Sequence, residues 1–125
     1  MPHAQRVALA VDDEPSDLEA VRKILENAGY AVLTAADGKT ALDKFQPNAE
    51  SVGLLVTDVA MSPMDGCELA SRLVQLKPSL RVVFVSAYSG AVAIRYRGQP
   101  LSDFVFVSKP FSAEELMSKG CRCRR

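Results

Sequence analysis

Large aromatic side chains are scarce in this chain of 125 residues, which contains no tryptophan and only 6% aromatic residues. A hydrophobic core must therefore come mainly from valine, leucine, isoleucine and alanine, among the 48% of residues that are hydrophobic. The length is close to the commonest size of a single domain. We therefore expect one domain over residues 1–125.

An excess of charge of either sign is also missing, because 15 basic and 15 acidic residues give a formal net charge of zero. Proteins whose main role is to bind nucleic acid usually carry a basic footprint, so this composition argues against that class. No apolar run is long enough to cross a bilayer, and no secretory signal follows Met1. We expect neither a nucleic acid nor a membrane as partner, and a cytoplasmic location.

Cysteine is too rare, and too unevenly placed, for a disulfide framework. The three cysteines are Cys67, Cys121 and Cys123, and an odd count with two of them crowded together does not suggest paired bridges. Two cysteines without further ligands are also a poor metal site. We expect the basic tail over residues 120–125 to be solvated.

What the sequence does contain is an alternation of short apolar runs and helical patterns. The apolar runs predict five strands, at residues 6–11, 30–35, 51–57, 81–86 and 103–107. Helical spacing of apolar residues follows the first three runs, and the segment 87–102 after the fourth is only weakly helical. This alternation predicts an α/β fold, a doubly wound five-stranded parallel sheet with helices on both faces.

Several helix ends can be placed from residue type. Pro15 suits the first turn of a helix, and Gly29 is a typical C-terminal stop. Ser112 and Glu115 have the spacing of a capping box, in which each side chain satisfies a backbone N–H at the helix start. We expect Gly120 to interrupt this last helix.

Polar residues follow four of the five predicted strands. Asp12 and Asp13 come after the first, Asp58 ends the third, Ser86 ends the fourth and Lys109 follows the fifth. In parallel α/β sheets, ligands bind beyond the carboxyl ends of the strands, where these residues would converge. Clustered carboxylates resist joint ionisation, whereas a hard cation such as Mg²⁺ prefers oxygen ligands. Such a site favours transfer of a phosphoryl group to an oxygen nucleophile, which aspartate can provide.

Structural explanations compete with this interpretation for each residue taken singly. Asp12 and Asp13 could be ordinary turn or N-cap residues. By periodicity alone, Phe106 is a strand residue that faces the core. The joint placement of acids, a hydroxyl and a lysine at the strand ends favours a functional site over these separate explanations.

The motifs "AVDDEP", "LLVTDVAMSPMDG", "VVFVSA" and "FVFVSKPF" occur in this order and spacing. The chain thereby resembles the receiver domain of two-component response regulators, over residues 6–119. The resemblance implies a flavodoxin-like fold with strand order 2-1-3-4-5. It also implies phosphorelay signal transduction, in which Asp58 accepts a phosphoryl group from a phosphohistidine donor with Mg²⁺, or Mn²⁺, as cofactor.

Residue roles follow from the same resemblance. Asp12, Asp13, Asp58 and the backbone carbonyl of Ala60 would hold the metal. Ser86 and Lys109 would contact the phosphoryl group, and Phe106 would be the switch aromatic that turns inward on activation. The implied bond geometry at Lys109–Pro110 is cis.

The resemblance also implies the partners and the kind of activity. The donor would be a sensor histidine kinase or a histidine phosphotransfer protein. The chain would not be an enzyme acting on a separate substrate, but a signalling domain that catalyses its own phosphorylation and dephosphorylation. Since no output domain follows, we expect a stand-alone regulator or a receiver taken from a larger protein.

Departures from the family pattern concern the loop after Asp58 and the switch. Ser62 stands where the family commonly has proline, and Pro63 comes one residue later. Phe106 lacks the phenol hydroxyl of the more usual tyrosine. The positions that tune the lifetime of the phosphorylated form in this family are Ala60 and Tyr88 here.

Two other classes of protein remain as alternatives. A pseudo-receiver would be an interaction module without phosphorylation, and would lack one of the acids, the hydroxyl or the lysine. A small flavodoxin-like cofactor binder would need a phosphate loop rich in glycine and hydroxyl groups after the first strand. The segment "DDEP" at residues 12–15 would instead repel a phosphate in the absence of a metal.

Overall fold

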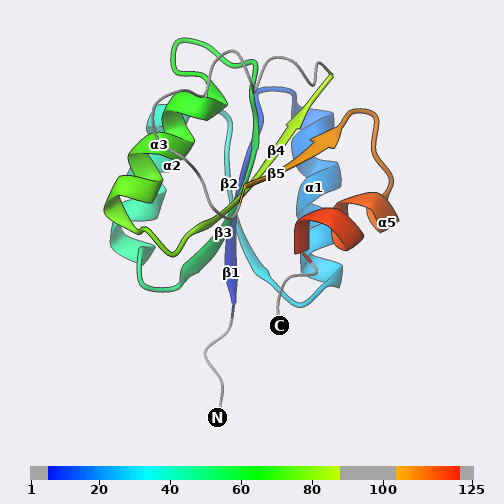
Figure 1. The fold of residues 1–125 in the computed structure, drawn as a ribbon, viewed down its shortest axis with the longest axis horizontal. Helices are drawn as coiled ribbons and strands as arrows, with labels where there is room; N and C mark the ends of the chain where they lie inside the picture. Colours follow the sequence, from blue (N-terminus) through cyan, green and yellow to red (C-terminus); the bar gives the residue numbers. More distant parts are fainter. Residues whose placement is uncertain (1–5, 88–103, 122–125) are drawn as a thin grey trace.

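The computed structural model describes residues 6–87 and 104–121, which contain a five-stranded parallel sheet in the order β2-β1-β3-β4-β5 (Figure 1). The strands are β1 (Val7–Val11), β2 (Ala31–Ala35), β3 (Val52–Asp58), β4 (Arg81–Ser86) and β5 (Phe104–Ser108). The predicted fold class and strand order are thereby confirmed. Each strand is found within one residue of its predicted limits.

Helices cover both faces of the sheet (Figure 1). On one side lie α1 (Pro15–Asn27) and, after β5, the short helix α5 (Ala113–Glu115), which continues as a π-helix, η2 (Leu116–Cys121). On the other side lie α2 (Gly38–Phe45) and α3 (Gly66–Leu76), and a short 3₁₀ turn, η1 (Gln46–Asn48), follows α2.

Helix starts are stabilised by local side chains, as the capping preferences predict. Asp37 accepts a hydrogen bond from the backbone N–H of Thr40 at the start of α2. Ser112 and Glu115 form the predicted capping box at the start of α5. Pro15 opens α1 as predicted, and Gly29 follows its C-cap with φ of 100°, a conformation that favours glycine.

The core has two halves, one on each face of the sheet. Alternate residues of β1 serve opposite faces, because side chains along a strand point to opposite sides. Leu9 packs in the half that contains Phe45 of α2, whereas Ala10 packs in the half that contains Leu25 of α1 and Leu116 of η2. Valine, leucine and alanine supply most of both halves, as the shortage of aromatic residues predicts.

One helix prediction was wrong, and another concerns a segment that lies mostly outside the described residues. Gly120 does not interrupt the final helix, since π-helical winding continues past it to Cys121. A glycine costs a helix only about 1 kcal/mol relative to alanine, which the surrounding packing can offset. Most of the weakly helical segment falls in residues 88–103, outside the described residues. Within residues 6–87 and 104–121, no helix is long and apolar enough to cross a membrane.

Candidate functional site

The register of the sheet aligns the predicted site residues at one edge. Val11 of β1 pairs with Thr57 of β3, so Asp12 and Asp58 follow at the same level. Asp58 in turn pairs with Val85 of β4, next to Ser86. We call this end of the sheet, where the strands' C-terminal ends meet, the carboxyl edge. The topology therefore brings together residues that are far apart in the sequence.

Three carboxylates gather at the carboxyl edge, and we call Asp12, Asp13 and Asp58 the acid cluster. One carboxylate oxygen from each lies within 4.8 Å of the others. Asp12 and Asp58 are buried, whereas Asp13 is exposed. An all-oxygen set of this kind suits a hard divalent cation better than a transition metal that prefers nitrogen or sulfur.

Burial makes Asp12 and Asp58, the two buried members of the acid cluster, reluctant to ionise. It raises the pKa of the Asp12 carboxyl above its usual value, although hydrogen bonds from the Glu14 backbone and from Lys109 act in the opposite direction. Burial also raises the pKa of Asp58, where the charge of Lys109 opposes the shift and the charge of Asp12 reinforces it. A cation in the cluster would remove much of this cost, because it favours the ionised form of each carboxyl group.

Lys109 provides the positive charge nearest to the cluster within the described part of the chain. Its Nζ lies 3.0 Å from an Asp12 carboxylate oxygen and 3.7 Å from one of Asp58. A third carboxylate, that of Asp17, lies 2.9 Å away. Burial alone would lower the pKa of Lys109, but the hydrogen bonds to Asp17 and Asp12 outweigh it and raise that pKa above its usual value. The lysine is therefore charged and engaged with several acids at once.

Asp12 combines a site position with a turn function, so part of the structural alternative holds for it. Its carboxylate accepts a hydrogen bond of 2.9 Å from the backbone N–H of Glu14, which is typical of an Asx turn. The N-cap of α1 is Glu14, without a side-chain cap. Asp12 and Asp13 are therefore not the N-cap of this helix.

The loop after β3 is held tightly against Asp58. The backbone N–H of Gly66 donates to the carbonyl of Val59 at 2.9 Å. A Cβ atom on Gly66 would lie 2.0 Å from the backbone oxygen of Asp58, so the close approach requires glycine. In this loop the Ser62–Pro63 bond is cis, which the sequence did not indicate.

The remaining predicted residues occupy the expected elements. Ser86 is buried at the end of β4, and its carbonyl accepts a hydrogen bond of 2.8 Å from the Lys109 backbone N–H. Ala60 is exposed, and its backbone N–H binds the Asp58 carboxylate. The Lys109–Pro110 bond is cis, as predicted. Tyr88 lies outside the described residues.

Phe106 lies on β5 opposite Phe84 and is half-buried. It packs against the half of the core that faces α2 and α3. Its core contact agrees with its strand periodicity, and its switch role stays a prediction.

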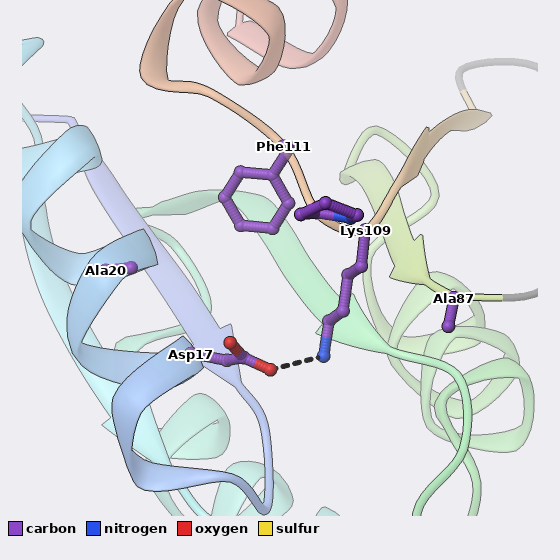
Figure 2. Close-up of a pocket in the computed structure, with 6 residues that line it drawn as sticks. Asp17, Ala20, Ala87, Lys109 and Phe111 are labelled. Atoms are coloured by element: carbon purple, nitrogen blue, oxygen red, sulfur yellow. Dashed lines mark hydrogen bonds and ion pairs between the residues drawn. The ribbon is translucent and has the colours of Figure 1, made fainter.

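Asp17 was missed by the sequence interpretation. It lies in the first turn of α1, and Figure 2 shows its carboxylate pointing at the Lys109 amine. Both residues line a pocket of about 320 Å³. An acidic residue in a first helical turn normally needs no further explanation, because it interacts favourably with the helix dipole. The one signal in the sequence is its distance from Pro15, which places it in that first turn.

Comparisons with known proteins agree on one family. The profile of the family described as "Response regulator receiver domain" matches residues 8–119. The response regulator receiver protein CpdR of Brucella abortus (strain 2308) is 36% identical over 92% of each chain. The sensor kinase CckA of the same strain is 33% identical over 86% of this chain, which spans only 11% of that kinase.

Solved structures show the same fold. The chemotaxis protein CheY4 of Vibrio cholerae matches with a TM-score of 0.76 and 27% identity, over 92% of this chain and 95% of that one. The acid cluster at the carboxyl edge fits a phosphoacceptor site of this kind of domain.

Proposed function

Because the chain belongs to the response regulator receiver domain family of two-component systems, we propose that Asp58 is its phosphoacceptor. The bond between phosphorus and the donor nitrogen of a phosphohistidine breaks, and a bond forms between phosphorus and a carboxylate oxygen of Asp58. The observation that carries this proposal is the position of that carboxylate, in the acid cluster and 3.7 Å from the Lys109 amine. Phosphoryl transfer depends mainly on positioning and on neutralisation of charge, which Lys109 and a cation in the acid cluster would supply.

We propose Mg²⁺ as the cofactor, with Mn²⁺ as a substitute. Asp12, Asp13, Asp58 and the backbone carbonyl of Ala60 would hold it. The acid cluster fits this ion, since its oxygen atoms are close together and one of its members is exposed to incoming water and phosphate. When bound, the ion supplies positive charge that offsets the charge of the phosphoryl oxygens.

Ser86 and Lys109 are proposed to contact the phosphoryl group once it is on Asp58. A ligand shifts a two-state equilibrium only if it interacts differently with the two states. A hydroxyl and an amine that engage the phosphoryl oxygens would supply this difference. Phe106, on the neighbouring strand, is the proposed switch aromatic that reports the change to the surface.

The proposed donor is a sensor histidine kinase or a histidine phosphotransfer protein, and we propose the cytoplasm as the site of action. The unit would be a single receiver domain over residues 1–125, acting as a signalling phosphoacceptor that also catalyses its own dephosphorylation. Similar proteins of two kinds support the two contexts considered for it, a stand-alone regulator and a receiver within a larger protein. The chain spans 92% of CpdR and only 11% of the sensor kinase CckA.

Incubation with acetyl phosphate, with and without Mg²⁺, tests the proposal. Intact mass measurement should detect one phosphoryl group in the parent with Mg²⁺ and none after chelation. Asp58→Asn should gain none, whereas Asp43→Asn, which changes an exposed acid paired with Lys39, should behave as the parent. Equal phosphoryl gain by Asp58→Asn would exclude Asp58 as the acceptor. No gain by the parent would instead favour a pseudo-receiver.

A further inference from the structure

The Lys109 amine contacts the carboxylates of three acids, and the shortest of these contacts is to an acid outside the acid cluster. Its distances are 2.9 Å to Asp17 and 3.0 Å to Asp12, both hydrogen bonds, against 3.7 Å to Asp58. A protonated amine has three donors, so two of them are engaged away from Asp58. The resting lysine is thus turned partly toward helix α1.

Asp17 is placed to hold the lysine there because it is fixed by its helix. It lies in the first turn of α1, which begins at Pro15. The Lys109 side chain is 18% exposed and that of Asp17 is 40% exposed, so the pair lies at the border between the site and solvent. Figure 2 shows the amine reaching Asp17 from the segment after β5, with Phe111 and Ala87 around the same pocket.

We propose that Asp17 is a positioning residue that restrains Lys109 in the resting domain and thereby slows phosphorylation of Asp58. This inference rests on the proposed function, in which Lys109 contacts the phosphoryl group. To make that contact, the amine must weaken its bond to Asp17 and turn toward Asp58.

An effect of Asp17 through Lys109 can be distinguished from a general effect of negative charge near the site. Any acid near the site repels an anionic phosphodonor, but only an acid that contacts Lys109 also restrains it. Glu19 offers the matched comparison, because it is exposed on the same helix and is paired with Arg22 rather than with Lys109. Glu19→Gln removes the same charge and also breaks an ion pair of α1.

The first measurement is the rate of phosphoryl gain from acetyl phosphate with Mg²⁺, followed by intact mass. Asp17→Asn should react about three- to fivefold faster than the parent, which corresponds to the upper range for partly exposed ion pairs. Asp17→Glu should return toward the parental rate, and Glu19→Gln should match the parent. A rate for Asp17→Asn that is lower than, or equal to, that of the parent or of Glu19→Gln overturns the proposal.

The second measurement requires neither phosphodonor nor metal. The Lys109 amine is labelled with limiting acetic anhydride and quantified by peptide mass spectrometry, with the exposed Lys39 as internal reference. Asp17→Asn should raise labelling of Lys109 about threefold or more, because loss of the 2.9 Å contact with the Asp17 carboxylate leaves the amine more accessible to the reagent. Labelling of Lys109 in Glu19→Gln should equal that in the parent.

The two measurements together decide the outcome. Faster phosphorylation without increased labelling would mean that Asp17 acts by charge and not through Lys109, and increased labelling without faster phosphorylation would mean that the contact exerts no restraint. Either result overturns the proposal. Failure of the proposed function is seen separately, as a parent that gains no phosphoryl group on Asp58, whereas the labelling comparison still reports the contact.

Discussion

Metal binding should stabilise the folded chain, and removal of one acid should substitute for part of that effect. The perturbation is Asp13→Asn, compared with the parent in chelator and in Mg²⁺. Asp12 and Asp13 are distant in sequence from Asp58, so the unfolded chain does not assemble the acid cluster. A cation that binds only the folded state then adds stability by mass action.

The expected sizes of the stabilisation by Mg²⁺ and of the stabilisation by Asp13→Asn can be calculated. At a Mg²⁺ concentration of ten times the dissociation constant, the gain in the free energy of unfolding is about 1.4 kcal/mol. For a chain of this length, that corresponds to a rise in Tm of roughly 4–7 °C. Two like charges separated by the 4.8 Å limit of the cluster repel by about 0.9 kcal/mol in water. Since Asp13 is exposed, the value for water applies, and Asp13→Asn should melt roughly 3–5 °C above the parent in chelator.

Differential scanning calorimetry of the two proteins in chelator and in Mg²⁺ at ten times the dissociation constant measures these shifts. Asp13→Asn should have a higher Tm than the parent in chelator, and Mg²⁺ should raise its Tm much less than it raises that of the parent. Asp43→Asn is the control, because Asp43 is paired with Lys39 on the surface of α2, and it should keep the full rise. If Asp13→Asn melts at or below the parent in chelator, repulsion within the cluster is negligible. If it keeps the full rise with Mg²⁺, Asp13 does not take part in metal binding.

Two further predictions concern the loop after β3 and the lifetime of the phosphorylated form. Gly66→Ala should lower the free energy of unfolding by about 1–3 kcal/mol, since its Cβ would lie 2.0 Å from the Asp58 carbonyl oxygen. Gly53→Ala, with no atom within 4 Å of its Cβ, should be neutral or stabilising in the same urea titrations. Ala60 has no polar side-chain atom to hold a water in line with the proposed Asp58–phosphorus bond, so Ala60→Asn combined with Tyr88→Glu should speed loss of the phosphoryl group. Loss of the phosphoryl group is followed by intact mass after the donor is removed. If the phosphorylated parent loses the group as fast as the double variant does, this prediction is wrong.

Much of the fold was predictable because its signals are local or follow general rules. Apolar runs marked the strands, and Pro15 and Gly29 marked the ends of α1. Parallel strands then place their C-terminal ends at one edge, which brings Asp12 and Asp58 together without any knowledge of contacts. Leu76 shows where such pattern rules end. It extends the apolar spacing of α3 but is 56% exposed.

The contact between Asp17 and Lys109 could not be predicted in the same way. The two residues belong to α1 and to the segment after β5, which no strand register connects. Their meeting depends on how α1 packs across β1 and on where the chain turns after Ser108, so it is a tertiary result rather than a pattern. The acid also has a sufficient local explanation at its helix position, since first-turn acids are common. The sequence thus indicates which acids and which lysine meet at the carboxyl edge, whereas the contact between the Lys109 amine and Asp17, at 2.9 Å, becomes visible only in the structure.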